Sequence, residues 1–313
     1  MYLPILRGKQ NELLALKELL NEKVLSENIL PIIEPTSPSS TFKNLLMQFS
    51  EQNRKIAVIQ NSEQVPYESF DTKEVTSLKK KSNFISALIV QNNAQCDFSK
   101  FLNANRMIIV DEKSEFNDSN KIEKDTYVVV EPNNRTALRL FKNSADYLVE
   151  YHDQFNKQER NVDYLDKEDE IFSVEHKFYE EDGYFGFSDY SIIGSDFRLS
   201  GFAAKAVAIH LVYFDKDFNL RIHHFVSDSN ENINDPAKKA HEALEKLVEF
   251  VNSNEFVFKD NRNNSSGLKE FKRLFNEDKY SGLGYIKKLS IKHHFEILGR
   301  YLDKWANVAK SVS

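Results

Sequence analysis

Short apolar runs alternate with amphipathic stretches along the first two-thirds of the chain. The runs recur about every 20 to 30 residues and mostly lack strict apolar–polar alternation, a pattern typical of strands buried on both faces of a parallel sheet. Seven of them cover residues 3–6, 29–33, 55–60, 86–90, 107–110, 127–130 and 147–150. The pattern predicts an eighth strand over residues 186–193.

The stretches between these runs have the spacing of helices. Residues 10–23, 41–53 and 134–143 carry Leu, Phe or Ala every three or four positions, and Thr41 is a suitable N-cap for the second of them. Strand, helix and strand with short connections make βα units. We therefore expect an α/β protein with a (β/α)8 TIM-barrel-like core. A doubly wound open sheet is the alternative, because a count of strands does not show closure.

The pattern changes in the last third. Residues 206–214 and 220–226 predict a β-hairpin, and residues 236–251 predict a helix that Asp235 caps. Two more helices are expected over 268–275 and 286–309. We expect a barrel core over residues 1–200 and a C-terminal hairpin with helices over 201–313, packed on the barrel as one compact unit. The highly charged residues 159–170 are interpreted as an exposed excursion, a lid over the site.

Composition excludes some classes of protein. The 24 Phe and 13 Tyr in 313 residues exclude a disordered chain, and no apolar run exceeds the length of a strand. The first residues lack the features of a signal peptide, and Cys96 is the single cysteine, which we interpret as structural or incidental. We therefore expect a cytoplasmic protein that does not enter the membrane.

Charge is distributed unevenly along the chain. The net charge is −6, yet residues 259–313 hold 12 Lys and Arg against 6 Asp and Glu. The acidic remainder argues against a nucleic acid partner. The basic end leaves a protein partner or a small anionic ligand as expectations, and an ordinary solvated helix face as the alternative.

Polar residues follow the predicted strands, at the end where barrel enzymes carry their active sites. Glu34 and Glu131 each precede a proline, which holds the preceding residue extended, and Asp111 lies between them in sequence. Three such carboxylates predict a site for a hard divalent metal, Mg²⁺ or Mn²⁺. Arg7 and Lys9 are the candidates to bind a phosphate.

Two further residues are candidates for acid or base catalysis. Asp189 lies in the eighth predicted strand, and His210 is a lone polar residue in an apolar run. A hydrogen-bonded core histidine is the alternative for His210. Gly282 and Gly284 precede the basic Lys287 and Lys288, so this helix start is either an anion site or a plain turn.

Five blocks of sequence resemble a known family. They are MYLPILRGKQNEL, PIIEP, GFSDY, AVAIH, and GLG followed by KKLS and HHFE. Together they are similar to an uncharacterised bacterial family catalogued after an open reading frame of a soil myxobacterium, itself distantly similar to the Beta-protein family. The resemblance implies an accessory bacterial protein, with phage defence as an association. It directs attention to Arg7, Lys9, Glu34, Asp189, His210, Lys287, Lys288 and His293.

These observations lead to one main hypothesis of function. It is a metal-assisted hydrolase, a phosphoesterase acting on a nucleotide or another phosphorylated small molecule. Glu34, Asp111 and Glu131 would hold the metal, and Asp189 or His210 would transfer the proton. Lys287, Lys288 and His293 would assist Arg7 and Lys9 in binding the substrate. The alternative is a non-catalytic binding or sensor module that uses the basic C-terminal helices.

Overall fold

Eight short parallel strands form the larger of two sheets. The computed structural model describes residues 1–62, 73–90, 105–115, 122–196 and 204–312. In spatial order the strands are β1 (Ile5–Leu6), β2 (Ile32–Ile33), β3 (Ile56–Ile59), β4 (Phe84–Ile89), β5 (Arg106–Val110), β6 (Tyr127–Val130), β7 (Tyr147–Tyr151) and β9 (Gly186–Ser188). Each strand pairs in parallel with the next along this order.

The two ends of this sheet meet. Tyr2 forms an isolated parallel bridge with Phe187, Leu3 N donates to Phe187 O at 2.8 Å, and Phe187 N donates to Met1 O at 3.0 Å. The sheet is therefore a nearly closed parallel barrel, which confirms the TIM-barrel-like fold. The open doubly wound sheet is excluded, because an open sheet leaves its first and last strands apart.

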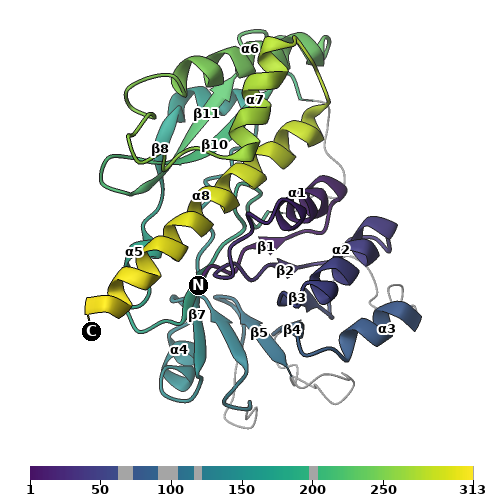
Figure 1. Cartoon of the computed structure of the whole chain (residues 1–313), viewed down its shortest axis with the longest axis vertical. Coiled ribbons are helices and arrows are strands. Elements are labelled where there is room, and N and C mark those ends of the chain that lie inside the picture. Colours follow the sequence, from purple (N-terminus) through teal and green to yellow (C-terminus); the bar gives the residue numbers. More distant parts are fainter. Residues whose placement is uncertain (63–72, 91–104, 116–121, 197–203, 313) are drawn as a thin grey trace. The chain divides into compact units, whose positions relative to one another are not determined.

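Helices follow several of the strands. They are α1 (Gln10–Asn21), α2 (Ser40–Glu51), α3 (Lys73–Lys79), α4 (Arg135–Phe141) and α5 (Glu175–Phe178). Figure 1 shows α2, α3 and α4 outside the strands. Ser39, rather than the expected Thr41, caps α2 by accepting from Phe42 N at 3.2 Å. Asn134 caps α4 by accepting from Ala137 N at 3.1 Å.

The barrel strands bury both faces, as their continuous apolar runs predict. Residues such as Ile5, Ile32 and Val129 form one cluster inside the barrel. The alternate residues, such as Ile108 and Val128, pack outward against α4 and its neighbours. The period of two along a strand therefore decides which side chains face the interior.

A smaller antiparallel sheet has the order β10 (Ala208–Phe214), β11 (Leu220–Val226) and β8 (Asp169–Ser173). The expected hairpin is confirmed by the pairing of β10 with β11. Residues 159–170, expected to be an exposed excursion, form the 3-10 helix η2 (Asn161–Lys167), with Tyr164 buried, and the start of β8, and their role as a lid stays a prediction. The hydrophobic pattern did not predict this strand because its residues are largely charged. Such residues are tolerated because β8 lies at an edge of its sheet, where Ile171 is 60% exposed.

Three helices complete this part of the chain. They are α6 (Pro236–Phe250), α7 (Ser266–Asn276) and α8 (Leu283–Val312), and their apolar faces share one core with β10. Figure 1 shows them beside β10 and β11. Asp235 is the N-cap residue of α6, as expected, but it has a φ of 50° and its side chain makes no capping hydrogen bond.

The chain forms two compact units. The first comprises Met1–Leu13, Glu27–Asp153 and Glu175–Tyr190, and the second comprises Leu14–Ser26, Gln154–Val174 and Ser191–Ser313. The barrel lies in the first unit and the antiparallel sheet in the second. In the part of the chain that the structure describes, no helix combines the length and the apolarity that a membrane crossing requires.

Candidate active site

The interior face of the barrel becomes polar where the strands end. Ile5, Ile32, Ile59, Ile109 and Val129 all belong to the interior cluster. Two positions further along each strand stand Arg7, Glu34, Asn61, Asp111 and Glu131. Because side chains alternate along a strand, these polar groups continue the interior face at its carboxyl end. We call this set, with Tyr151 and Tyr190, the barrel mouth.

Arg7 and Glu34 form a buried ion pair in the barrel mouth. Their exposed fractions are 7% and 3%, and Arg7 Nη1 donates to Glu34 Oε2. Ser62 Oγ donates to Glu34 Oε1 at 2.9 Å, and the Arg7 guanidinium lies 4.3 Å from the centre of the Tyr190 ring. Both carboxylate oxygens of Glu34 therefore accept hydrogen bonds, and Arg7 is the cation that pairs with this carboxylate.

The backbone after Arg7 must pass close to Glu34. Gly8 has a φ of +64°, and a Cβ on it would lie 2.9 Å from Glu34 O. A side chain here would meet both strain and a clash. The glycine therefore lets the first two strand ends approach closely enough for the ion pair to form.

Asp111 and Glu131 stand on neighbouring strands. The register pairs Val110 of β5 with Val130 of β6, so the residues that follow them are adjacent. Asp111 Oδ1 accepts from Lys113 N at 3.0 Å, and Glu131 Oε2 accepts from Glu112 N at 3.1 Å. Asp111 is exposed and Glu131 is half-buried, so both carboxylates remain accessible to solvent.

The three predicted metal ligands do not form one cluster. Among the described residues, no three Asp, Glu, His or Cys side chains converge as a full protein cation site requires. The structure therefore brings Asp111 and Glu131 together and pairs Glu34 with Arg7 instead. Metal binding itself stays a prediction.

Two tyrosines of the barrel mouth were not predicted from the sequence as site residues. The rings of Tyr151 and Tyr190 make an edge contact at 5.9 Å between centroids. Burial raises the pKa of both phenols, and for Tyr190 the charge of Arg7 partly opposes that rise. Both hydroxyl groups therefore stay protonated at neutral pH and can donate hydrogen bonds. The alternation from Val149 to Tyr151 indicates that Tyr151 faces the barrel interior. An aromatic residue at the end of a strand is, however, most simply interpreted as part of the hydrophobic core.

Asp189 does not belong to the inward-facing set. It alternates with Tyr190, is 2% exposed, and accepts from Tyr2 Oη at 2.6 Å. Tyr2 itself stacks on Phe187 at 5.1 Å between centroids. Asp189 thus stabilises the seam between the first and last strands, and its proton-transfer role stays a prediction.

His210 lies on β10, in the second unit. Its Nδ1 is 2.7 Å from His224 Nδ1, and its ring is 4.7 Å from that of Tyr164. Burial lowers the pKa of His210 well below its usual value, and the charges of His224 and Lys287 add to this. His210 is therefore a neutral, hydrogen-bonded imidazole at pH 7, the alternative that the sequence left open. Catalysis by His210 is not tested by this contact.

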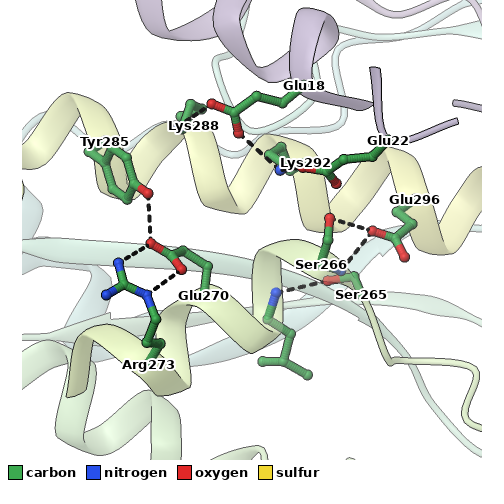
Figure 2. A network of polar contacts seen from close by, with 11 residues as sticks. Glu18, Glu22, Ser265, Ser266, Glu270, Arg273, Tyr285, Lys288, Lys292 and Glu296 are labelled. Carbon is green, nitrogen blue, oxygen red and sulfur yellow. Dashed lines mark hydrogen bonds and ion pairs between the residues drawn. The ribbon is translucent and has the colours of Figure 1, made fainter. Parts of the chain in front are cut away.

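Two predicted substrate-binding residues are engaged inside the second unit. Lys288 is 5% exposed, and its ammonium lies 2.5 Å from Glu18 Oε1. Figure 2 shows the two side chains pointing toward each other. His293 is fully buried, its Nδ1 lies 2.7 Å from Ser265 Oγ, and burial lowers its pKa to about 3.

The other candidates differ in exposure. Lys9, which follows Arg7 and Gly8 in the sequence, is exposed, whereas Lys287 is half-buried. Cys96 lies outside the described residues.

Glu150 is an acidic residue with a perturbed pKa outside the barrel mouth. Burial raises its pKa to about 8, with the nearby carboxylates of Glu175 and Asp182 adding to the effect. The folded state therefore binds more protons than the unfolded state between pH of about 4.5 and 8, so stability falls as pH rises through this window.

Glu150→Gln should remove this loss. We expect wild type to lose roughly 1–2 kcal/mol more stability than the variant between pH 5 and pH 8, after allowance for solvent screening of a half-buried group. Urea unfolding at both pH values measures it, with the exposed Glu51→Gln as the control. Equal pH dependence in wild type and Glu150→Gln would refute this assignment.

Comparison of the chain with protein-family models, with curated protein sequences and with solved structures gave no match. The resemblance of the sequence blocks to the myxobacterial family therefore stays a prediction. Assignment of function rests on the barrel mouth.

Proposed function

We propose that the barrel is a metal-assisted hydrolase that cleaves a phosphoester in a nucleotide or another phosphorylated small molecule. The observation that carries this proposal is the adjacent, solvent-accessible carboxylate pair of Asp111 and Glu131 on β5 and β6. Mg²⁺ characteristically takes one or two protein carboxylates, several waters and the phosphate of the substrate. Two carboxylates are therefore sufficient, and a cluster of three is not needed.

Other residues of the barrel mouth, together with Lys9, suit a phosphorylated substrate. Tyr151 and Tyr190 are neutral hydroxyl donors, and Lys9 is an exposed cation next to the first strand end. Arg7 holds Tyr190 from its ring face while it neutralises Glu34. In this proposal Arg7 and Glu34 hold the strand ends of the barrel mouth in place. Lys9 and the two tyrosine hydroxyl groups contact the phosphate. A bound metal would supply an activated water.

Turnover tests the proposal. Full-length protein is incubated with a panel of nucleotides and sugar phosphates, with Mg²⁺ or Mn²⁺ and with EDTA. Asp111→Asn and Glu131→Gln should each lower the metal-dependent rate roughly 100-fold, as loss of a metal-site carboxylate does. Glu51→Gln, an exposed helix variant, should match wild type.

Undiminished turnover in the Asp111→Asn/Glu131→Gln double variant would overturn the proposed site. Failure of wild type to cleave any phosphoester would favour the binding-module alternative. A role in bacterial defence stays a prediction that rests on the sequence resemblance alone.

A further inference from the structure

The turn that follows β5, from Asp111 to Ser114, donates a backbone amide to each carboxylate of the proposed metal pair. Glu112 N donates to Glu131 Oε2 at 3.1 Å, and Lys113 N donates to Asp111 Oδ1 at 3.0 Å. Ser114 N closes the turn by donating to Asp111 O at 3.3 Å. The backbone of this β5 turn therefore sets the orientation of both carboxylates, although Glu131 follows the next strand.

These hydrogen bonds engage one oxygen of each carboxylate. Among the described residues, the hydrogen bonds to the Asp111 carboxylate reach Oδ1, and the hydrogen bond to the Glu131 carboxylate reaches Oε2. Oδ2 of Asp111 and Oε1 of Glu131 are then the oxygens that a cation and its waters would contact. A donor on one oxygen restricts rotation of the carboxylate, so less freedom is lost when a metal binds.

Asn134 holds the β5 turn from the connection between β6 and α4. Its Nδ2 donates to Asp111 O and to Ser114 O, both at 2.9 Å, and its backbone N donates to Glu131 O at 2.9 Å. Asn134 is 6% exposed, so water competes little for these hydrogen bonds. One residue thus ties the backbone of Asp111 to the backbone of Glu131.

The helix cap alone does not account for an asparagine here. Asn134 Oδ1 accepts from Ala137 N at 3.1 Å, which caps α4, and Ser, Thr or Asp would supply that acceptor equally well. The two hydrogens of the amide nitrogen serve the two carbonyl groups of the β5 turn instead. Of the residues that favour an N-cap, asparagine is the one whose side chain combines an acceptor with two donors.

We propose that Asn134 is the positioning residue of the Asp111 and Glu131 metal site. It keeps the β5 turn in the geometry in which both carboxylates meet one cation, and it does not contact the cation itself. This inference rests on the proposed function, because it assigns Asn134 a role in the metal site of that hydrolase. Metal affinity should therefore depend on the amide nitrogen of Asn134 and not on its capping oxygen.

Calorimetric titration of EDTA-treated full-length protein with Mn²⁺ tests the inference. Asn134→Ser keeps a capping oxygen for α4 but is too short to reach Asp111 O and Ser114 O, so the Kd for Mn²⁺ should rise roughly 10-fold or more. Asn134→Asp keeps the shape and the cap without a side-chain donor, and it should raise the Kd at least as much.

Ser39→Ala is the matched control, because it removes the N-cap of α2 and should leave the Kd unchanged. Thermal unfolding of each variant shows that it is folded at the temperature of the titration. The Kd of wild type in both folded Asn134 variants, or the same rise in Ser39→Ala, would overturn the role of Asn134 alone. Absence of Mn²⁺ binding to wild type, or undiminished binding to Asp111→Asn/Glu131→Gln, would overturn the proposed site and the positioning role together.

Discussion

Arg7→Met should lower the free energy of unfolding of the barrel by about 3–5 kcal/mol. Arg7 and Glu34 are 7% and 3% exposed, so removal of the guanidinium leaves a buried carboxylate without its ion-pair partner. Ser62 would remain as one hydrogen-bond donor to Glu34, which satisfies an oxygen but not the charge. Urea unfolding monitored by circular dichroism measures the loss.

A double-mutant cycle distinguishes this cause from lost packing. Arg7→Met/Glu34→Met removes both charges, so it should recover most of the stability that Arg7→Met loses. The stacking of Arg7 on Tyr190 is lost in both variants, which makes the comparison matched. If the double variant were less stable than Arg7→Met, the buried pair would not be the source of the effect.

Gly186→Ala should cost about 2–4 kcal/mol, because it disrupts the seam that closes the barrel. A Cβ at Gly186 would lie 2.5 Å from Met1 O and 2.9 Å from Leu3 Cδ1. The backbone of Met1 accepts the hydrogen bond from Phe187 N, so it cannot move away without breaking the seam. Chemical denaturation of the variant measures this cost.

Gly183→Ala is the matched control for the seam. Gly183 has a φ of +84° but nothing within 4 Å of its Cβ position, so alanine meets backbone strain alone. We expect a loss of about 1 kcal/mol for that strain. Equal losses at Gly186 and Gly183 would mean that the approach of the first strand to the last contributes little to stability.

The barrel was predictable from the sequence because its strands are buried on both faces. A continuous apolar run as short as 127–130 predicts a buried strand rather than a helix, and βα alternation favours parallel pairing. Closure was not predictable, since it depends on hydrogen bonds between residues as distant as Leu3 and Phe187. The strand β8 was missed because an edge strand tolerates the charges of Asp169 and Glu170.

The barrel mouth was predictable in part. Strand ends identified Glu34, Asp111 and Glu131, and the register places the last two side by side. The partner of Glu34 was not predictable, because the sequence separates it from Arg7 by 27 residues and gives no distance. Lys288 looked like an exposed cation in a basic segment, yet its ammonium pairs with Glu18 of α1, 270 residues away.

Metal-dependent thermal unfolding tests the hydrolase proposal most directly. EDTA-treated full-length protein is melted alone and with Mg²⁺ or Mn²⁺, and the measurement is repeated on Asp111→Asn/Glu131→Gln. A metal that binds the folded state alone stabilises it by about 2.7 kcal/mol at 100 times its Kd, so Tm should rise by several degrees in wild type and stay constant in the variant. No rise in wild type, or the same rise in both proteins, would contradict a metal site at Asp111 and Glu131.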